Sequence, residues 1–413
     1  MRVITDLHIH SRFSRACSKA LTIPNLAKRC EQKGIQLVTT GDFTHPAWRK
    51  EMGESLEEAE GGAFALRDGS SPTRFILGTE VSCIYKRGGK TRRVHNLLFL
   101  PTFAAVDRFT SMLTDRGFNV KSDGRPILGL DSEDLLKMLF ESDERAIFIP
   151  AHIWTPWFAI FGSQSGFDSM EECFGDSSRY IHALETGLSS DPAMNWRWSA
   201  LDRYFLVSNS DAHSLDKLGR EANVFDMETP TYDELRRILV EHDVSKFLET
   251  IEFFPEEGKY HTDGHRDCGF WCEPEETKRM KGMCPKCGKP MTVGVLHRVA
   301  DLADRPRGGR PPSAVPFRSI IPLDELVADA LSVGSASKKV QAKLGELLKN
   351  GRTEFGILLD LPESELRLVA GEELARVIMR MRAGDVEIRP GYDGEFGKIH
   401  VKDGVKNVQT ALL

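Results

Sequence analysis

Short apolar, β-branched runs alternate with helical patterns over the first 250 residues of the chain. The runs have the length and composition of strands, and they lie at 3–7, 35–40, 74–81, 94–100, 146–150, 181–185 and 204–207. Helix start signals stand between several of them, at Thr22 with Pro24, at Asp131 and at Thr231. The alternation predicts an α/β fold, either a parallel barrel or a doubly wound sheet.

The pattern changes after residue 255. Residues 256–299 hold four Cys and three His among many basic residues, and 304–316 is rich in Arg, Pro and Gly. Helical periodicity returns beyond residue 320, and Asp393-Gly394 indicates a terminal hairpin. We therefore predict three parts: a barrel over 1–255, a small metal-binding module with a basic linker over 256–319, and a helical domain with a terminal hairpin over 320–413.

Composition narrows the class of protein. The 413 residues begin without a basic start and apolar signal core, and the most apolar stretch is broken by Pro150, His152 and Pro156. Eight Cys are too few for a disulfide scaffold in a chain of this length. We therefore expect a cytoplasmic protein in a reducing compartment, without a membrane segment.

The negative net charge of the whole chain argues against a polyanionic partner, but the charge is unevenly distributed along the sequence. The chain carries −6, which divides into −9 over residues 1–258 and +3 over residues 259–413. Any basic surface must therefore be sought locally rather than in the sum.

Histidines and carboxylates gather where the predicted strands end, as the active-site residues of a barrel do. Side chains two apart in a strand share a face, so His8 and His10 are able to hold one cation together. A lone pair of this kind is often only two surface histidines. Here further carboxylates and imidazoles stand near strand ends, and several divalent ions would offset their mutual repulsion; they are Asp42, His45, Glu80, His95, His152, Glu185, Asp211 and His213.

Four cysteines of the second part have metal-site spacing. Cys268-x3-Cys272 and Cys284-x2-Cys287 form two knuckles, which predict one structural zinc ion. His261, His265 or His297 is an alternative to one thiolate, and redox exchange by the second knuckle is a weaker alternative.

Basic and aromatic residues flank the candidate ligands. Solvated loop charge is the simplest interpretation of the basic residues, but their places beside ligands and knuckles favour contact with phosphate; they are Arg12, Arg15, Lys19, Arg87, Arg92, Arg93, Lys281 and Lys286. The loop after His152 carries Trp154, Trp157 and Phe158. Those aromatic residues either pack on the barrel or form a wall for an unstacked base.

The ordered motifs HxH, Asp, Glu, His, PAH and SDAH resemble the polymerase and histidinol phosphatase (PHP) superfamily. That resemblance implies a distorted (β/α)7 TIM-like barrel around two or three divalent metals, Zn, Mn or Mg. It implies that His8, His10, Glu80 and Asp211 are catalytic ligands of one metal. Glu80 would bridge to a second metal, held by His95 and His152, and His213 would bind a third. The usual TDH motif stands here as Gly41-Asp42-Phe43, with Asp42 as the expected ligand.

The barrel, the Cys-rich module and the helical tail together resemble the endonuclease Q family of DNA repair nucleases. The phrases that carry the resemblance are DLHIHSRFSRACSKALTIPNLA, TTGDFTHPAW, LGTEVSCIYKRGGKTRRVHNLLFLP, IPAHIWTPWF and SNSDAHSLDKLGREAN. The resemblance implies hydrolysis of the phosphodiester 5′ of a deaminated base, uracil or hypoxanthine, or of an abasic site.

Three hypotheses for the function remain at this stage. A metal-dependent, lesion-specific endonuclease uses every part of the chain, with damaged DNA as its partner in the nucleoid. A phosphatase of a small phosphomonoester needs only the barrel. A noncatalytic DNA-binding or scaffold protein conflicts with the nearly complete ligand set. We expect a monomer, and a sliding clamp is a candidate partner of the helical tail, although no decisive motif points to it.

Overall fold

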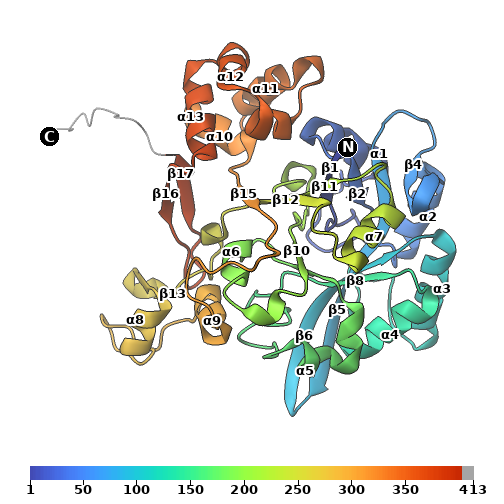
Figure 1. Cartoon of the computed structure of the whole chain (residues 1–413), viewed down its shortest axis with the longest axis horizontal. Helices are drawn as coiled ribbons and strands as arrows, with labels where there is room; N and C mark the ends of the chain where they lie inside the picture. Colours follow the sequence, from blue (N-terminus) through green and yellow to red (C-terminus); the bar gives the residue numbers. More distant parts are fainter. Residues whose placement is uncertain (402–413) are drawn as a thin grey trace.

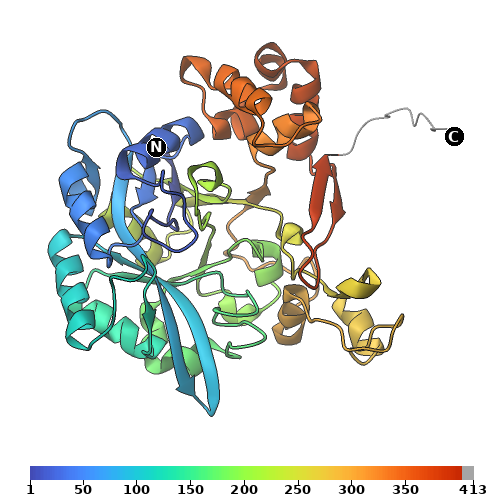
Figure 2. The ribbon, with the colours of Figure 1, turned by 180° about the vertical axis from the view of Figure 1, so that it is seen from behind.

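The structure, a computed structural model, describes residues 1–401. One eleven-stranded mixed sheet organises the first part of the chain (Figures 1 and 2). Its main path runs through β15 (Phe317–Ser319), β12 (Phe247–Glu252), β11 (Ala222–Asp226), β1 (Arg2–Asp6), β2 (Leu37–Thr39), β5 (Arg74–Arg87), β4 (Phe64–Leu66) and β3 (Leu56–Glu58). From β5 it also continues to β6 (Lys90–Leu100), β8 (Ile147–Pro150) and the short β7 (Ile127–Leu128).

The strand directions are mixed, whereas the sequence predicted a parallel arrangement. Strands β1, β2 and β5 are parallel, but β1 pairs antiparallel with β11, and β6 pairs antiparallel with both β5 and β8. For β5 and β6 the reason lies at Gly88 and Gly89, whose positive φ angles of 59° and 74° form a tight turn. Such a turn joins antiparallel strands, whereas parallel strands need a long crossover. Strand β5 reaches Arg87 and β6 begins at Lys90, so most of residues 85–93 belong to this hairpin's strands.

Two further strands complete this part. Strands β9 (Ala183–Glu185) and β10 (Phe205–Val207) are parallel partners, and β9 lies beside β8. One apolar cluster takes side chains from β1, β2, β5, β6, β8, β9, β10 and β11, so these strands share one core. The mixed α/β class is confirmed. No backbone ladder joins β8 to β9 or β10 to β11 within residues 1–401, and barrel closure stays a prediction.

Helices cover the outside of these strands (Figure 1). They are α1 (Ile23–Lys33), α2 (Pro46–Ser55), α3 (Phe103–Asp115), α4 (Ser132–Ser142), α5 (Met170–Phe174), α6 (Pro192–Asn195) and α7 (Tyr232–Glu241). The predicted caps Asp131 and Thr231 accept hydrogen bonds from the backbone N–H groups of Glu133 and Glu234. Thr22 precedes α1 as expected but makes no side-chain cap bond.

The module contains β13 (Asp263–His265), β14 (Phe270–Cys272), α8 (Pro274–Arg279) and α9 (Val295–Leu302). Its own core is small, with Cys272, Cys284 and Met291 buried. The terminal hairpin of β16 (Val386–Arg389) and β17 (Lys398–Val401) joins it through backbone hydrogen bonds, from Gly391 to Glu256 and from Thr262 to Gly391. Residues 317–319, expected in a linker, instead form β15 beside β12.

The C-terminal helices are α10 (Leu323–Ala330), α11 (Lys338–Leu347), α12 (Glu363–Ala370) and α13 (Glu372–Arg382). They dock on the first part through a buried ion pair, in which Lys33 Nζ lies 2.8 Å from Glu354 Oε1. Both residues are almost fully buried, at 1% and 3% exposure. Among the helices of residues 1–401, none is long and apolar enough to cross a membrane.

Candidate metal-dependent active site

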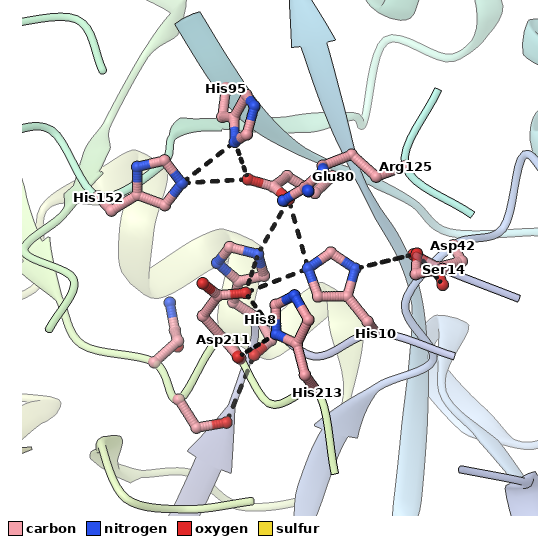
Figure 3. A network of polar contacts seen from close by, with 12 residues as sticks. His8, His10, Ser14, Asp42, Glu80, His95, Arg125, His152, Asp211 and His213 are labelled. Atoms are coloured by element: carbon pink, nitrogen blue, oxygen red, sulfur yellow. Dashed lines mark hydrogen bonds and ion pairs between the residues drawn. The ribbon is translucent and has the colours of Figure 1, made fainter. Parts of the chain in front are cut away.

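Strand ends bring the predicted ligands together in one buried cluster (Figure 3). His8 and His10 follow β1, Glu80 lies on β5 and His95 on β6, and His152 follows β8. A parallel bridge between Ile9 and Ala212, with His10 N donating to Ala212 O over 3.0 Å, brings the loop after β10 beside the HxH motif. Asp211 and His213 reach the cluster from that loop.

The cluster contains two groups of converging ligand atoms. His8, His10 and Asp211 form the first, and Glu80, His95 and His152 form the second, each with its ligand atoms within 4.8 Å of one another. In the first group, Asp211 Oδ1 lies 3.1 Å from His10 Nε2 and 3.5 Å from His8 Nε2.

Glu80 lies between the two groups. Its Oε1 is 2.6 Å from His95 Nδ1 and 3.2 Å from His152 Nε2. Its Oε2 faces the first group, 3.3 Å from His10 Nε2 and 3.6 Å from His8 Nε2. One carboxylate therefore presents one oxygen to each group, which is the arrangement that a bridging ligand requires.

The donor set fits divalent metal ions. The buried His8 Nε2 has no hydrogen-bond partner, and His95 Nδ1 and His152 Nε2 are only 3.3 Å apart. Imidazole nitrogen and carboxylate oxygen bind Zn²⁺ and Mn²⁺ well. Ions held among these atoms would satisfy the unpaired nitrogen and separate the crowded rings.

Two buried carboxylates hold the rings of the HxH motif from behind. Glu185 Oε1 lies 3.0 Å from His8 Nδ1, and Asp42 Oδ1 lies 3.1 Å from His10 Nδ1. Asp42 also accepts hydrogen bonds from Ser11 N, Ser11 Oγ and Ser14 Oγ, at 2.7, 2.6 and 2.8 Å. Such partners fix the ring and its tautomer, so that the other nitrogen faces the metal.

This placement changes the expected role of Asp42. The sequence predicted a metal ligand, but Asp42 belongs to neither converging group, because its oxygens are already occupied behind His10. Glu185 was noticed as a carboxylate at a strand end but was not assigned to the site. His213 lies at the edge of the cluster, where its Nδ1 is 2.9 Å from the backbone oxygen of Asp211.

Backbone strain concentrates at the cluster. Asp42, His152 and Asp211 have φ angles of 49°, 29° and 46°, a region that side chains other than glycine rarely adopt. Gly187 allows the conformation of His152, because a Cβ at residue 187 would stand 2.4 Å from the His152 Cβ. Close packing around the ligands therefore maintains geometry that the backbone alone disfavours.

Arg125 is a residue of this cluster that the sequence did not reveal. Its Nη1 donates to Glu80 Oε2 over 2.9 Å. The approach depends on Gly124, since a Cβ there would stand 2.2 Å from Asp42 Oδ2. The Asp123 carboxylate accepts from Arg15 N and Arg125 N, at 3.2 and 3.1 Å, and holds this turn against the HxH loop.

Carboxylates set the protonation of the cluster. Burial disfavours the charged imidazole, but Glu185, Asp211 and Glu80 outweigh it and hold the pKa of His8 well above its usual value. The pKa of Asp211 is lowered against its own burial, chiefly by His8 and His10. Burial lowers the pKa of His95 to about 4 despite the nearby Glu80 carboxylate. Metal binding would replace the protons on His8 and His10, so it should release protons.

A second ligand group lies in the module. His265, Cys268, Cys284 and Cys287 converge within 4.8 Å, and Cys287 Sγ lies 3.5 Å from His265 Nδ1. Cys272, one of the four predicted thiolates, is outside this group, because it is buried with its Sγ 3.2 Å from Thr277 Oγ1. His265, which the sequence offered as an alternative to one thiolate, stands in its place.

The aromatic residues after His152 divide into a buried and an exposed set. Trp154 is fully buried and donates from Nε1 to Asn195 Oδ1 over 2.7 Å, so it packs in the core and does not line an open pocket. Trp157 is 43% exposed, and the Phe158 ring lies 4.7 Å from the His95 ring. Trp157 and Phe158 line a cavity of about 770 Å³ together with Tyr260.

The predicted phosphate-binding residues differ in their availability. Arg15 and Lys19 line an open cavity of about 690 Å³ beside the HxH loop, together with Arg12, which pairs with Glu51 at 2.7 Å. Three of the remaining residues already have partners: Arg87 pairs with Asp131 and Glu133, Arg92 donates to Gly166 O, and Lys286 donates to Cys268 O. Arg93 lies on β6, two residues before His95, and Lys281 follows α8.

Comparison with known proteins covers the whole chain. The uncharacterized protein YqxK of Bacillus subtilis (strain 168) is 31% identical over 416 residues, which cover 96% of this chain and 99% of that protein. Residues 322–385 match the family described as the MJ0043 C-terminal domain.

Two crystal structures are similar over nearly their full length. One is the lesion-specific endonuclease PfuEndoQ from Pyrococcus furiosus, with a TM-score of 0.86 and 33% identity over 98% of this chain and 96% of that chain. The other is endonuclease Q in complex with a 27-mer duplex substrate that has an abasic lesion at the active site, with a TM-score of 0.84 and 33% identity over 98% and 97%. Identity and coverage at this level show that the chain belongs to the endonuclease Q family.

Proposed function

We propose that this protein is a DNA repair endonuclease that hydrolyses the phosphodiester 5′ of a deaminated base, uracil or hypoxanthine, or of an abasic site. The observation that carries the proposal is the Glu80 carboxylate, which faces a separate ligand group with each oxygen. The full-length similarity to an endonuclease Q bound to a duplex with an abasic lesion supports DNA as the substrate.

We infer that two divalent ions occupy the two ligand groups, with a third near His213. His8, His10 and Asp211 would hold one, His95 and His152 the second, and Glu80 both. Such ions supply a water of lowered pKa and neutralise negative charge on the phosphate. This chemistry needs no Ser or Cys nucleophile.

The residues around the ions would orient the metal ligands and neutralise charge on the phosphate. Glu185 and Asp42 hold the His8 and His10 rings in one tautomer, so their Nε2 atoms face the first group. Arg125 stands at Glu80 with 28% of its side chain exposed, and its guanidinium is available to pair with a phosphate oxygen as charge develops.

The finer fold assignment is also part of the proposal. We infer that the strands sharing one core around the cluster close as a distorted (β/α)7 PHP-type barrel over residues 1–255. One structural zinc ion would then bind His265, Cys268, Cys284 and Cys287 in the module. A basic module beside a phosphoesterase site favours contact with a nucleic-acid backbone.

We assign the extruded nucleotide to the cavity under Trp157 and Phe158. Phe158, which lines the cavity, packs against His95, and a base cannot be inspected while it is stacked in the duplex. Tyr260, Lys217 and Arg220 supply polar groups on its walls. Arg12, Arg15 and Lys19 would contact the backbone on the other side of the HxH loop.

A cleavage assay tests the proposal. Labelled duplexes with one deoxyuridine, one deoxyinosine, one abasic site or no lesion are incubated with the protein and Mn²⁺, Mg²⁺ or Zn²⁺. We expect one nick 5′ of each lesion and an intact control duplex. Hydrolysis of a small phosphomonoester without any nick would favour the phosphatase hypothesis, and DNA binding without turnover of either substrate would favour a noncatalytic role.

The same purified protein can be used to test the two predictions about its partners. Gel filtration with light scattering tests the expected monomer, and the addition of a sliding clamp tests whether the helical domain docks to it. Residues 402–413 lie outside the described part of the chain.

A further inference from the structure

Arg197 is a buried cation without a partner. It follows α6, is only 9% exposed, and its Nε and Nη1 atoms are fully buried without a hydrogen bond. No residue in the range 1–401 forms a salt bridge with its guanidinium. Arginine is rarely buried unless it is paired, because an isolated buried charge loses its hydration without compensation. The position therefore calls for an anion that the chain itself does not supply.

The Arg197 side chain lines a cavity of about 420 Å³, separate from the catalytic cluster. The lining residues come from all three parts of the chain: from α6, the segment before β13, β14, α9, the linker after α9, and β16. Trp271 on β14 stands in this wall and remains 40% exposed, although it is large and aromatic. A buried guanidinium and an exposed indole thus meet in one hollow.

A second guanidinium faces the same cavity. Arg307 of the basic linker lines it and pairs with Glu273 at the rim. The charged groups that act on Arg197 are Arg307, Glu275 and Glu273. Asp191 and Glu256 also line the cavity, but burial raises the pKa of both carboxyls, so each holds a proton more readily than an exposed carboxyl. Because Glu273 pairs with Arg307, Arg197 is the guanidinium of this cavity that lacks an ion-pair partner among residues 1–401, and it is the group to which an anion would bind.

We propose that this cavity binds one nucleotide unit, with its phosphate on Arg197 and its base against Trp271. The planar fork of a guanidinium matches phosphate oxygens, and an exposed aromatic ring stacks any base. The inference rests on the proposed function for its source, a DNA strand, although a free nucleotide offers the same chemistry.

The position relative to the catalytic cluster fits a strand. His261 lines both this cavity and the one under Trp157 and Phe158, so the two hollows share a wall. A DNA strand with one nucleotide in the cavity under Trp157 and Phe158 would therefore pass the cavity at Arg197. The Arg197 site would then fix the strand at a point away from the scissile bond, where it affects binding and not the chemical step.

The test compares the metal-loaded full-length protein with the variants Arg197→Met and Trp271→Ala. Arg203→Met is the matched control, since Arg203 is a half-exposed arginine that pairs with Glu171 and does not line the cavity. For Arg197→Met we expect at least about tenfold weaker binding of the lesion duplex. The slope of log K against log salt should fall by about 0.9, and KM should rise with kcat unchanged.

Thermal unfolding separates this result from misfolding. Loss of an unpaired buried cation should leave the Tm of Arg197→Met equal to or above that of the wild type. Inorganic phosphate and a deoxynucleoside monophosphate should raise the wild-type Tm more than that of Arg197→Met. A response to the mononucleotide with unchanged DNA affinity would identify a free nucleotide as the source.

Equal DNA affinity, equal salt slope and equal Tm responses in wild type and Arg197→Met would overturn the inference. That result is distinct from failure of the proposed function, because wild-type cleavage of lesion duplexes is measured independently. A protein that binds the mononucleotide through Arg197 but nicks no lesion would instead contradict the endonuclease and retain the site.

Discussion

The cluster around Glu80 and the group in the module are both sets of converging candidate metal ligands, but the protein supports them in opposite ways. In the cluster, His8, His10 and Glu80 are at most 1% exposed, and the HxH rings are held from behind by buried carboxylates. In the module, Cys287 is exposed, and His265 and Cys268 are half-buried. The fourth member, Cys284, is buried in a small core together with Cys272 and Met291.

The contrast separates a cluster that the surrounding fold orders from a module whose fold depends on its bound ion. The cluster lies on and after strands that a large apolar core positions, so we expect its geometry to persist without bound ions. The module buries too little apolar surface to order its turns by packing alone, which is a general property of small domains. An ion bound there contributes folding free energy, whereas ions in the cluster contribute chemistry.

The largest effect should follow loss of a ligand in the cluster. Asp211→Ala removes the carboxylate that faces both HxH nitrogens, so we expect nicking to be abolished and DNA binding to be largely retained. Nicking assays and fluorescence anisotropy measure the two quantities, and Asp115→Ala at the exposed end of α3 is the control. Undiminished nicking by Asp211→Ala would refute the ligand assignment.

A smaller effect should follow loss of a supporting carboxylate. Glu185→Gln keeps the shape behind His8 but removes the charge, and we expect metal affinity or kcat to fall by about 10–100-fold. Metal titration and single-turnover cleavage measure the change against Glu144→Gln, an exposed control. If both quantities equal those of the wild type, the cluster does not depend on its supporting carboxylates, and the contrast with the module weakens.

The module should affect binding and local order, not the chemical step. Cys268→Ser should lower the zinc content by about one ion per chain and expose residues 266–290 to proteolysis, while cleavage at saturating DNA continues. Cys272→Ser is the matched variant, since this thiol bonds Thr277 outside the ligand group, and its zinc content should stay at the wild-type value. Equal zinc loss in both variants would restore the four-thiolate assignment. The readouts are metal analysis and limited proteolysis.

The smallest effect on cleavage belongs to Glu252, a buried carboxyl outside both ligand groups that accepts a hydrogen bond from Ser208 Oγ. Burial raises the pKa of Glu252 to about 8, from 4.5 when unfolded. The folded protein therefore keeps a proton that the unfolded chain releases, and this stabilisation is present below pH 4.5 and lost as pH rises to about 8. Glu252→Gln should flatten the dependence of Tm on pH in this window and leave kcat unchanged. A wild-type dependence retained in the variant would contradict this assignment.

The sequence predicted the parts of the site that lie on strands. His8, His10, His152 and Asp211 follow short apolar runs, and Glu80 and His95 lie near the edges of two others, so their convergence could be inferred from periodicity and motif order. The orientation of Asp42 could not, because it depends on Ser11 and Ser14 hydrogen bonds within a turn. Arg125 carries no motif, and only the packing of Gly124 on Asp42 brings it to Glu80.

The remaining differences have similar causes. Cysteine spacing predicts a ligand set but not the register of β13 with β14, which pairs Cys272 with Asp263 and brings His265 nearer to the turn at Cys268. The parallel order was predicted from alternating elements, but alternation does not fix strand direction, and β1 pairs antiparallel with β11 and β6 with β8. Arg197 gave no signal in the sequence, because its burial results from segments distant in the chain.

The Lys33–Glu354 ion pair also sets an order of events during synthesis. The two residues are 321 positions apart, so the ribosome makes Lys33 long before its counter-ion. At about 5–20 residues per second, the delay is roughly 16 to 64 seconds. During that time the end of α1 cannot bury its lysine without an uncompensated charge. We therefore expect the Lys33 end of α1 to remain hydrated until the segment that carries Glu354 has been synthesised.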